Sequence, residues 1–365
     1  MPNSSPSSPS PLQICKIDLS KNQQELVDYV QRVLSETDSH KSSIMNSGFW
    51  NWQYAQSPGQ HSCVYVAYSE NKIAGYYHVP VYAGFVDKKP ALLAMIQDVA
   101  VDANLRGQGL FRKLATFANN DIDAQQIAAC YTFPNTKSIH TFLKYNAFAI
   151  TKTFATYMMP VNTGLILRKK LKIPLLSEWA GTLVDFFLAP AKKGNTQNIR
   201  LIKEFDAEVE KLFSSYCERF HNYTSRSIEF LKWRYMQRPS SLYFSLGYYH
   251  QEQLTAIAIF KFDYMFDVPV LLLMDYAFTD SNQLMQLISS AALYSKDYTN
   301  EKIAFVFTTC CDVNFEKANK GKFIRIPEKL NPRKLNMLTR NVSSKSESIS
   351  QANKWFATLG DWDVF

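Results

Sequence analysis

The sequence has little that would mark a metal-binding, disulfide-bonded or membrane-spanning protein. Its six cysteines form no Cys-x-x-Cys pair and have no histidine at ligand spacing, which predicts reduced, structural thiols and no metal centre. The most hydrophobic helical stretch, 175–189, contains Glu178 and Asp185 and is too short to cross a bilayer. The first residues, 1–12, lack a basic region followed by an apolar core, which favours a flexible tail over a signal peptide. We therefore expect a cytoplasmic protein without stable membrane insertion.

The positive charge of the chain is not concentrated in one place. Lys and Arg number 40 against 32 Asp and Glu, a formal net charge of +8, yet no long basic tract with interleaved aromatics occurs. A nucleic-acid-binding groove is therefore not expected. A positive balance does suit an enzyme that attracts a polyanionic cofactor.

The length and hydrophobic content predict a folded protein of two domains. A chain of 365 residues with 46% hydrophobic content, including 20 Tyr and 25 Phe, can bury two cores of ordinary size. Disorder is excluded for most of the chain, because such apolar content offsets the entropy of ordering.

The segment 92–114 is the most informative stretch. An apolar, strand-like run is followed by a turn containing Gly107 and Gly109, and then by apolar residues at the helical spacing of Leu110, Leu114 and Phe117. The two glycines lie where a strand leads into a helix N-terminus. Such a turn allows close approach of an anion, and the free N–H groups and the helix dipole favour negative charge. A phosphate or pyrophosphate ligand is predicted.

A second element follows at 127–148. Residues 127–133 have the pattern of a short buried strand, and 134–148 that of a capped helix ending in a turn. Asn135 lies at the start of this second helix.

These two elements resemble motifs of the GNAT superfamily, the acetyl-CoA-dependent N-acetyltransferases. Arg106-Gly-Gln-Gly109 is similar to its Arg/Gln-x-x-Gly-x-Gly/Ala motif, although Phe111 replaces the final small residue. Asn135, Ser138 and Phe142 match the later Asn-x-x-small-x-x-x-aromatic element, and Ala147-Phe148 replaces its Gly-Phe pair. The resemblance implies that acetyl-CoA is the co-substrate and that its pyrophosphate is bound mainly by main-chain N–H groups. The implied coenzyme-binding residues are Arg106, Gly107, Gln108, Gly109, Leu110, Phe111 and Asn135.

The chain also contains an internal repeat. Segments 49–58 and 230–239 share Phe, Trp, Tyr, Gln and Pro at identical spacing, and similar strand and helix patterns surround both. A repeat of about 180 residues indicates a duplicated domain. It places Asp98 opposite Asp275. The second copy has no glycine where the first has its glycine turn, so the coenzyme is expected in the first copy alone.

The predicted fold class is α/β, as tandem GNAT-like domains. Each domain is expected to be a mixed, largely antiparallel sheet flanked by helices. The expected boundaries are a disordered tail at 1–12, a GNAT domain at 13–162, a helical linker at 163–198 and a degenerate GNAT-like domain at 199–365.

Acetyl transfer has two requirements. The attacking amine must lose a proton, and a hydrogen-bond donor must stabilise the thioester oxygen as it gains charge. The GNAT pattern implies a backbone donor on the strand before the turn, which makes the amides of Val99 and Val101 the candidates for thioester and pantetheine contacts. Asp98, the nearest acidic residue, is the candidate base. The alternative is a structural acid, which Asp275 in the second copy favours.

Many GNAT enzymes use a tyrosine of the second helix to protonate the leaving thiolate. The matching position here is Leu143, so Tyr131 and Tyr145 are the catalytic candidates for this role. A packed aromatic is the alternative for each.

The function expected from these observations is N-acetyl transfer from acetyl-CoA to a primary amine of a small molecule. Among acceptors, an amino sugar of surface-polysaccharide assembly is the first choice, because similar two-domain proteins often belong to such pathways. A Fem-type aminoacyltransferase and an acyl-CoA-binding sensor or scaffold without turnover are the alternatives. The sequence does not determine the oligomeric state.

Overall fold

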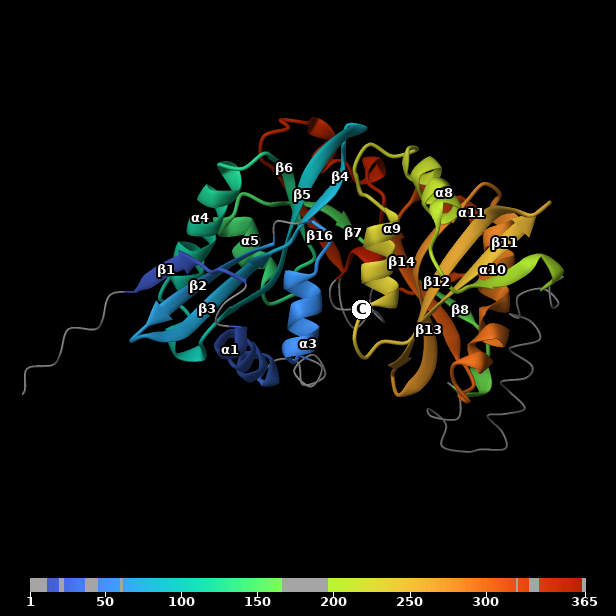
Figure 1. The fold of residues 1–365 in the computed structure, drawn as a ribbon, viewed down its shortest axis with the longest axis horizontal. Helices are drawn as coiled ribbons and strands as arrows, with labels where there is room; N and C mark the ends of the chain where they lie inside the picture. Colours follow the sequence, from blue (N-terminus) through green and yellow to red (C-terminus); the bar gives the residue numbers. More distant parts are fainter. Residues whose placement is uncertain are drawn as a thin grey trace, which may run out of the picture. The chain divides into compact units, whose positions relative to one another are not determined.

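The computed structural model describes residues 12–19, 23–36, 45–59, 62–165, 196–319, 321–327 and 335–362 (Figure 1). Most of the expected tail and linker lies outside these ranges. The chain divides into two compact units, each of them discontinuous in sequence. Unit 1 consists of Met1–Ala83, Ala91–Ala149 and Leu338–Lys345, and unit 2 of Gly84–Pro90, Ile150–Met337 and Ser346–Phe365.

The sheet of unit 1 has the strand order β1-β2-β3-β5-β6-β16, in which only the β5–β6 pair is parallel. β7 follows β16 in the same order, and β4 pairs with β5. The strands are β1 (Gln13–Lys16), β2 (Cys63–Ser69), β3 (Lys72–Val79), β4 (Val81–Val86), β5 (Lys89–Val101), β6 (Ile127–Thr132), β7 (Ala149–Thr153) and β16 (Asn336–Asn341). The helices are α1 (Gln23–Ser35), α3 (Ser47–Trp50), the π-helix η1 (Asn51–Ala55), the 3-10 helix η2 (Ala103–Leu105), α4 (Leu110–Asp123) and α5 (Ile139–Tyr145).

Unit 2 repeats this arrangement with the order β9-β11-β12-β13-β14-β8, and β15 follows β8. Again only the central β13–β14 pair is parallel. The strands are β8 (Thr156–Pro160), β9 (Ile199–Ile202), β11 (Tyr243–His250), β12 (Gln253–Met265), β13 (Val268–Phe278), β14 (Phe305–Cys311), β15 (Ile324–Arg325) and β17 (Ala357–Thr358); β10 (Tyr223–Thr224) pairs with β4. The helices are α8 (Ala207–Cys217), α9 (Ile228–Leu231), the π-helix η4 (Lys232–Met236), α10 (Ser281–Tyr294) and α11 (Val313–Ala318), with 3-10 turns η3 (Thr196–Asn198), η5 (Ser295–Asp297), η7 (Glu347–Ser350), η8 (Ala352–Lys354) and η9 (Leu359–Asp361).

The two units are therefore tandem mixed α/β units, and the predicted fold class is confirmed. Both repeated sequence blocks form a short α-helix that continues into a π-helix, α3–η1 in unit 1 and α9–η4 in unit 2. The strand next to β6 is β16, from the second half of the sequence, whereas the strand next to β14 is β8, from the first half. Each sheet is thus completed by a strand from the other repeat.

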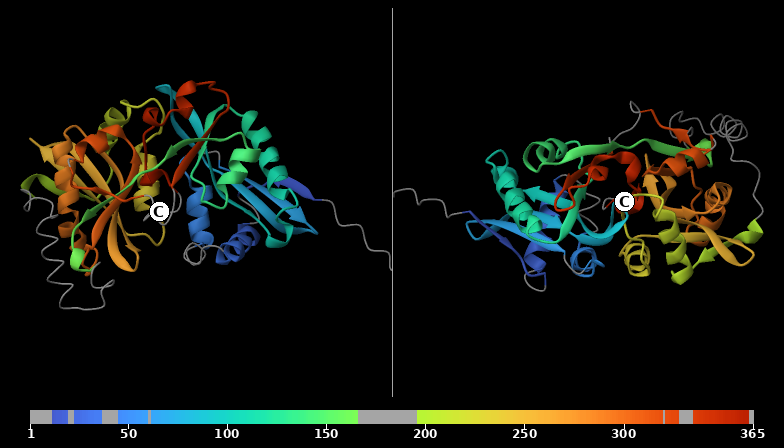
Figure 2. Two further views of the ribbon diagram at one scale, coloured as in Figure 1. Left: turned by 180° about the vertical axis from the view of Figure 1, so that it is seen from behind. Right: turned by 90° about the horizontal axis from the view of Figure 1, so that it is seen from above.

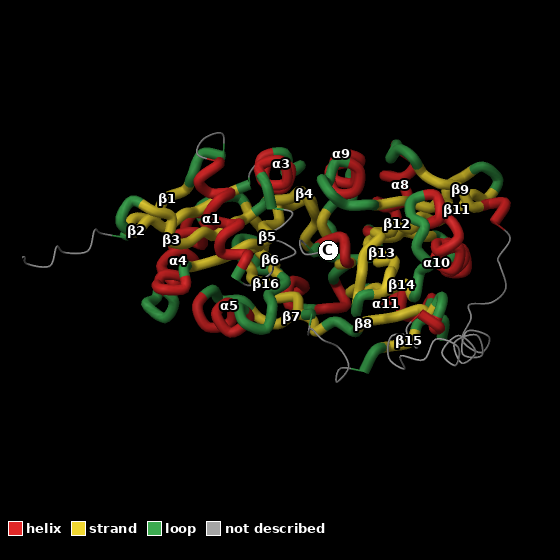
Figure 3. Tube along the Cα trace, turned by 90° about the horizontal axis from the view of Figure 1, so that it is seen from below, coloured by secondary structure: helices red, strands yellow, loops and turns green. Residues whose placement is uncertain are grey.

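Helices cover both faces of each sheet. In unit 1, α4 and α5 lie on one face and α1 and α3 on the other; in unit 2, α10 and α11 lie opposite α8 and α9 (Figures 2 and 3). The core beneath α4 contains the buried residues Leu110, Leu114, Ala115 and Ala118, packed on Tyr77 and other inward-facing residues of the sheet. Burying one face of α4 in this way fixes its N-terminus at the end of β5.

Three features expected from composition can be compared with the described part of the chain. Its cysteines are free thiols, and five of the six are buried. No described helix is long and apolar enough to span a membrane. Among the described residues, no group of three or more His, Cys, Asp or Glu side chains is arranged to hold a metal ion.

Candidate active site

The glycine turn of unit 1 is open on the side where a ligand would approach. Gly107 and Gly109 have φ angles of +79° and +78°, a left-handed conformation that favours glycine. A Cβ atom built on either residue would meet no described atom within 4 Å. The two glycines therefore serve the backbone conformation and leave space above the turn, as a cradle for an anion requires.

The N-terminus of α4 has no side-chain cap, since Gly109 occupies the cap position. The long helices of unit 2 differ: α8 and α10 are capped by the carboxylates of Asp206 and Asp280. The first amides of a helix have no partner within the helix, and they favour an anion through their N–H groups and the helix dipole. At α4 no side chain of the described residues takes this position.

Two predicted coenzyme-binding side chains are engaged with the backbone of the turn itself. Arg106 Nε donates to Val101 O at 3.1 Å, and Gln108 Nε2 donates to Asn104 O at 2.9 Å. Both residues are exposed. Their backbone N–H groups also donate within the loop, from Arg106 to Ala103 O at 3.3 Å and from Gln108 to Leu105 O at 3.4 Å. Both residues therefore hold the loop in shape, and their contact with the coenzyme stays a prediction.

Asn135 has a similar local role at the start of α5. Its Oδ1 accepts hydrogen bonds from the backbone N–H groups of Lys137 and Ser138, both at 2.9 Å. These bonds form a turn that leads into α5 and provide the capping that Ser138, at the cap position, does not. The side chain of Asn135 therefore orders the second predicted element.

The end of β5 extends beyond its pairing with β6. β5 pairs with β6 from Leu92 to Ile96, which lies opposite Thr132, and Thr132 Oγ1 donates to Ile96 O at 2.8 Å. On the other edge, Asp102 N donates to Ala74 O at 2.9 Å. Because hydrogen-bonded pairs alternate along an antiparallel ladder, the amide of Val101, opposite Gly75, points away from β3. Val99 and Val101 both lie beyond the last pair of β5 with β6, and their role as thioester and pantetheine donors stays a prediction.

A bulge turns Asp98 out of the regular strand. Its φ is +46°, and the β3–β5 register shifts between Tyr76 and His78. Val101 belongs to the core beneath α4 and Val99 packs against it, so Asp98 faces the opposite side, toward η1. The carboxylate is half-buried and accepts hydrogen bonds at Oδ2 from Gln53 Nε2, at 3.1 Å, and from the hydroxyl of Tyr54.

Sequence reasoning gave Gln53 and Tyr54 no role in the site. Both belong to the repeated block 49–58, which marks the duplication but says nothing of contact with a strand 45 positions away. His78 lies in the same place: its ring is buried, its centroid is 3.5 Å from that of Tyr54, and its Nδ1 is 3.3 Å from Gln97 Nε2. A polar cluster therefore surrounds the Asp98 carboxylate.

The two tyrosine candidates occupy different environments. Tyr131, on β6, is 2% exposed, and its ring centroid is 5.8 Å from that of Phe133. Tyr145 ends α5, is 41% exposed, and lies beneath the ammonium group of Lys144. Leu143, on the same helix, is also exposed.

The site described above lies in a segment that matches a known family. Residues 20–146 match the family model described as an acetyltransferase (GNAT) domain. The chain carries a GNAT acetyltransferase domain. It is therefore an acyltransferase whose co-substrate is of the coenzyme A type.

Solved structures with similar folds extend over both units. A probable N-acyltransferase of Enterococcus faecalis V583 matches with a TM-score of 0.63 and 12% identity, over 92% of this chain and 74% of that one. N-myristoyltransferase of Saccharomyces cerevisiae, with bound myristoyl-CoA, matches with a TM-score of 0.60 and 18% identity, over 91% and 84%. A GCN5-related N-acetyltransferase of Anabaena variabilis matches with a TM-score of 0.59 and 13% identity, over 91% and 73%. No curated protein matches the sequence. At these identities the structures share the fold.

In unit 2, the counterpart of Asp98 is sealed inside the protein. Asp275 is fully buried; its Oδ2 accepts from Arg226 Nε at 2.6 Å and from the Tyr235 hydroxyl at 3.0 Å. Arg226 also forms a pair with Asp361, at 2.7 Å. Burial raises the pKa of the Asp275 carboxyl, and Arg226 opposes that shift. The tyrosine–aspartate contact of the GNAT domain is thus repeated in unit 2 without its access to solvent.

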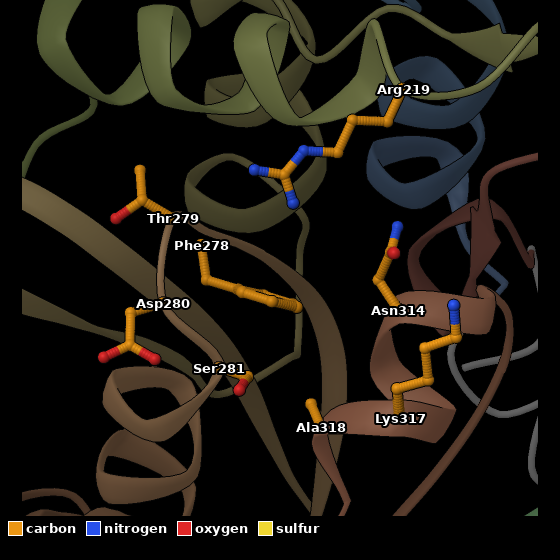
Figure 4. Close-up of a pocket in the computed structure, with 8 residues that line it drawn as sticks. All are labelled: Arg219, Phe278, Thr279, Asp280, Ser281, Asn314, Lys317 and Ala318. Atoms are coloured by element: carbon orange, nitrogen blue, oxygen red, sulfur yellow. The ribbon is translucent and has the colours of Figure 1, made fainter.

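In unit 2, the segment equivalent to the glycine turn lines a shallow pocket of about 460 Å³ (Figure 4). It lies between the start of α10 and α11, and its lining includes Arg219 and Lys317. The carboxylate of Asp280 already accepts from Asn282 N at 2.9 Å. Because the chain's own carboxylate occupies the anion position at the start of α10, the pocket differs from the open cradle of the GNAT domain.

Proposed function

We propose that this protein transfers an acetyl group from acetyl-CoA to a primary amine, with the coenzyme bound by unit 1 alone. The observation that carries the proposal is the uncapped start of α4 beside two left-handed glycines, at the end of a strand whose last residues extend beyond its pairing with β6. Gly107, Gly109, Leu110 and Phe111 would bind the pyrophosphate through backbone N–H groups, with Asn135 ordering the neighbouring turn. Arg106 and Gln108, whose N–H groups donate within the loop, would hold the turn in shape. This backbone cradle also argues against a Fem-type enzyme, which does not need one.

The chemistry follows from the placement of these groups. The amide of Val99 or Val101 would donate to the thioester oxygen as it gains charge. Asp98 would take a proton from the amine, whose nitrogen attacks the thioester carbon; the carbon–sulfur bond then breaks and the thiolate is protonated. Tyr131 and Tyr145 are the candidate donors of that last proton.

The acceptor and the acyl chain are the finer parts of the proposal. An amino sugar is our first choice of acceptor, on the resemblance to two-domain GNAT proteins. The yeast enzyme of similar fold was solved with myristoyl-CoA, so a longer acyl group is the second candidate donor.

The decisive experiment incubates the protein with acetyl-CoA or myristoyl-CoA and a panel of amines, and monitors the release of free thiol. The panel would contain glucosamine, spermidine and a dipeptide with a free N-terminus. Release with acetyl-CoA and glucosamine supports the proposal in full. Binding of acetyl-CoA without release in the presence of any of these amines would favour a sensor or scaffold.

The cradle assignment predicts that Gly109→Val weakens coenzyme A binding by about 1–2 kcal/mol or more. A valine at a φ of +78° is strained by itself, and its side chain would fill the space that the pyrophosphate needs. Calorimetry on folded protein measures the change, and the wild type is expected to give one site per chain.

A matched control separates strain from loss of the cradle. Gly321 in unit 2 also has a φ of +78° with no described atom within 4 Å of an added Cβ. Gly321→Val should cost similar stability and leave coenzyme affinity unchanged. Equal affinity of the wild type and a folded Gly109→Val protein would rule out the cradle.

A further inference from the structure

We propose that the pocket of unit 2 between α10 and α11 is a binding site for a sugar phosphate. The phosphate binds to Arg219 and Lys317, and the hydroxyl groups of the sugar bind to Asp280 and Ser281. The volume of about 460 Å³ is within the range of small-molecule sites. Every residue that lines the pocket belongs to unit 2, so the inference does not depend on the acetyl transfer proposed for unit 1.

Two cations line this pocket without a counter-ion from the chain. Arg219 follows the end of α8 and Lys317 lies on α11, and both residues are exposed. Neither side chain forms a hydrogen bond or an ion pair with the residues that the structure describes. The two acids that precede Lys317 have other partners: Asp312 accepts from two tyrosine hydroxyls, and Glu316 accepts from the hydroxyl of Tyr157 at 3.0 Å. Both positive charges are therefore available to a ligand.

The guanidinium group of Arg219 is held in place by two aromatic rings. Its central carbon lies 4.7 Å from the ring centroid of Tyr216 and 6.0 Å from that of Phe278, which are cation–π distances. Both rings are buried, so they form a fixed surface beneath the cation. Figure 4 shows the Arg219 side chain extending over Phe278. A guanidinium group over a ring keeps the N–H groups at its edge available, and this forked edge fits the oxygens of a phosphate.

The charges of the pocket favour a phosphate over a carboxylate. Asn314 and Lys317 are three residues apart on α11, so their side chains project from the same face of the helix. Together with Arg219 they offer two positive charges and N–H donors from two segments of the chain. A phosphate monoester carries about 1.5 to 2 negative charges at neutral pH and three strong acceptor oxygens. It matches this set of donors better than a carboxylate, which carries a single charge.

The rest of the lining favours hydroxyl groups over an aromatic base. Phe278 is 4% exposed and lies beneath Arg219, so it offers no open ring on which a base could stack. Asp280 accepts from Asn282 N through Oδ1, and its Oδ2 has no partner among the described residues. This oxygen and the Ser281 hydroxyl can accept hydrogen bonds from the hydroxyl groups of a sugar. The sugar would thus lie toward α10 and the phosphate toward α11.

The place of the pocket in the fold agrees with a ligand other than coenzyme A. The pocket lies where β13 leads into α10, as the glycine turn of unit 1 lies where β5 leads into α4. At α10 the carboxylate of Asp280 caps the helix, so the first backbone amides are not open to an anion. Recognition of a phosphate therefore depends on the side chains of the neighbouring segments.

The test is calorimetry of the full chain with glucose 6-phosphate. Lys317→Met and Arg219→Gln should each weaken binding by about tenfold or more, because each loses a charge-assisted hydrogen bond to the phosphate. Lys317 is exposed, so Lys317→Met should fold even if Arg219→Gln does not. Lys211→Met is the matched control: it removes an exposed lysine of α8 that does not line the pocket, and affinity should equal that of the wild type.

Three further measurements define the ligand and the place where it binds. Glucose, which has no phosphate, and glucuronate, which carries a carboxylate, should bind at least about tenfold more weakly than glucose 6-phosphate. Gly109→Val, which alters the turn of unit 1, should leave affinity for glucose 6-phosphate unchanged.

Four results would overturn the inference and leave the proposed acetyl transfer standing. They are no binding of glucose 6-phosphate by the wild type, equal affinity of the wild type and folded Lys317→Met, equally tight binding of glucuronate, and loss of binding in Gly109→Val. The last of these would assign the phosphate to the glycine turn of unit 1.

Discussion

Asp98→Asn is expected to lower kcat for acetyl transfer by roughly two orders of magnitude or more, with affinity for acetyl-CoA nearly unchanged. General-base contributions are commonly of this size, and asparagine keeps the shape of the side chain but cannot accept the proton. The coenzyme contacts proposed here are backbone groups of 99–111, which this substitution does not remove. Steady-state kinetics and calorimetry on one preparation measure both quantities.

The pH–rate profile provides a second readout of this prediction. A variant without the base should lose the acidic limb of the profile, because no proton-accepting group is then titrated on that side. Turnover within a few-fold of the wild type, or unfolding of the variant, would favour the structural role that Asp275 has in unit 2. Catalysis would then depend on positioning an already neutral amine against the thioester.

Arg226→Ala is expected to destabilise unit 2 by about 3–5 kcal/mol. Arg226 is completely buried between Asp275 and Asp361, at 2.6 Å and 2.7 Å, so its removal leaves two buried carboxylates without a cation. Arg226 Nη1 also donates to Thr224 O at 3.0 Å, and this bond would be lost as well. Equilibrium unfolding in urea, followed by tryptophan fluorescence, measures the change.

An exposed ion pair of the same unit is the control for this substitution. Arg200 pairs with Glu252 at 2.7 Å, and both side chains are largely in solvent. Arg200→Ala should therefore change stability little, because exposed pairs are screened by water. Arg226→Lys keeps the charge but loses the forked geometry, so it should fall between the wild type and Arg226→Ala. An Arg226→Ala protein as stable as Arg200→Ala would show that the buried triad contributes little to the fold.

Local sequence signals were sufficient for the elements that carry the proposed coenzyme site. Gly107 and Gly109 predicted a turn that few other residues could form, and both have left-handed φ angles. The helical spacing after the turn predicted α4, which begins at Leu110. The internal repeat predicted that Asp98 and Asp275 are equivalent. Both lie in the first strand of the parallel pair, β5 and β13, and each accepts a hydrogen bond from the tyrosine of its π-helix.

The contacts that distinguish the two repeats depended on the tertiary structure. The sequence does not show that β8 and β16 are exchanged between the two sheets. A short apolar strand has the same sequence pattern whichever sheet it joins, so only pairing with a strand distant in sequence selects its place. The left-handed φ of Asp98 likewise has no local signal, because Asp275 has no positive φ although the β12–β13 register also shifts beside it.

The sequence by itself determined the duplication, the fold class and the glycine turn, because each is recorded in the spacing of neighbouring residues. The tertiary structure decided which aspartate is accessible and which is sealed. Gln53 reaches Asp98 across 45 positions, and Arg226 reaches Asp361 across 135. Such contacts form only when the packing of whole units brings distant segments together, so no pattern within either segment predicts them.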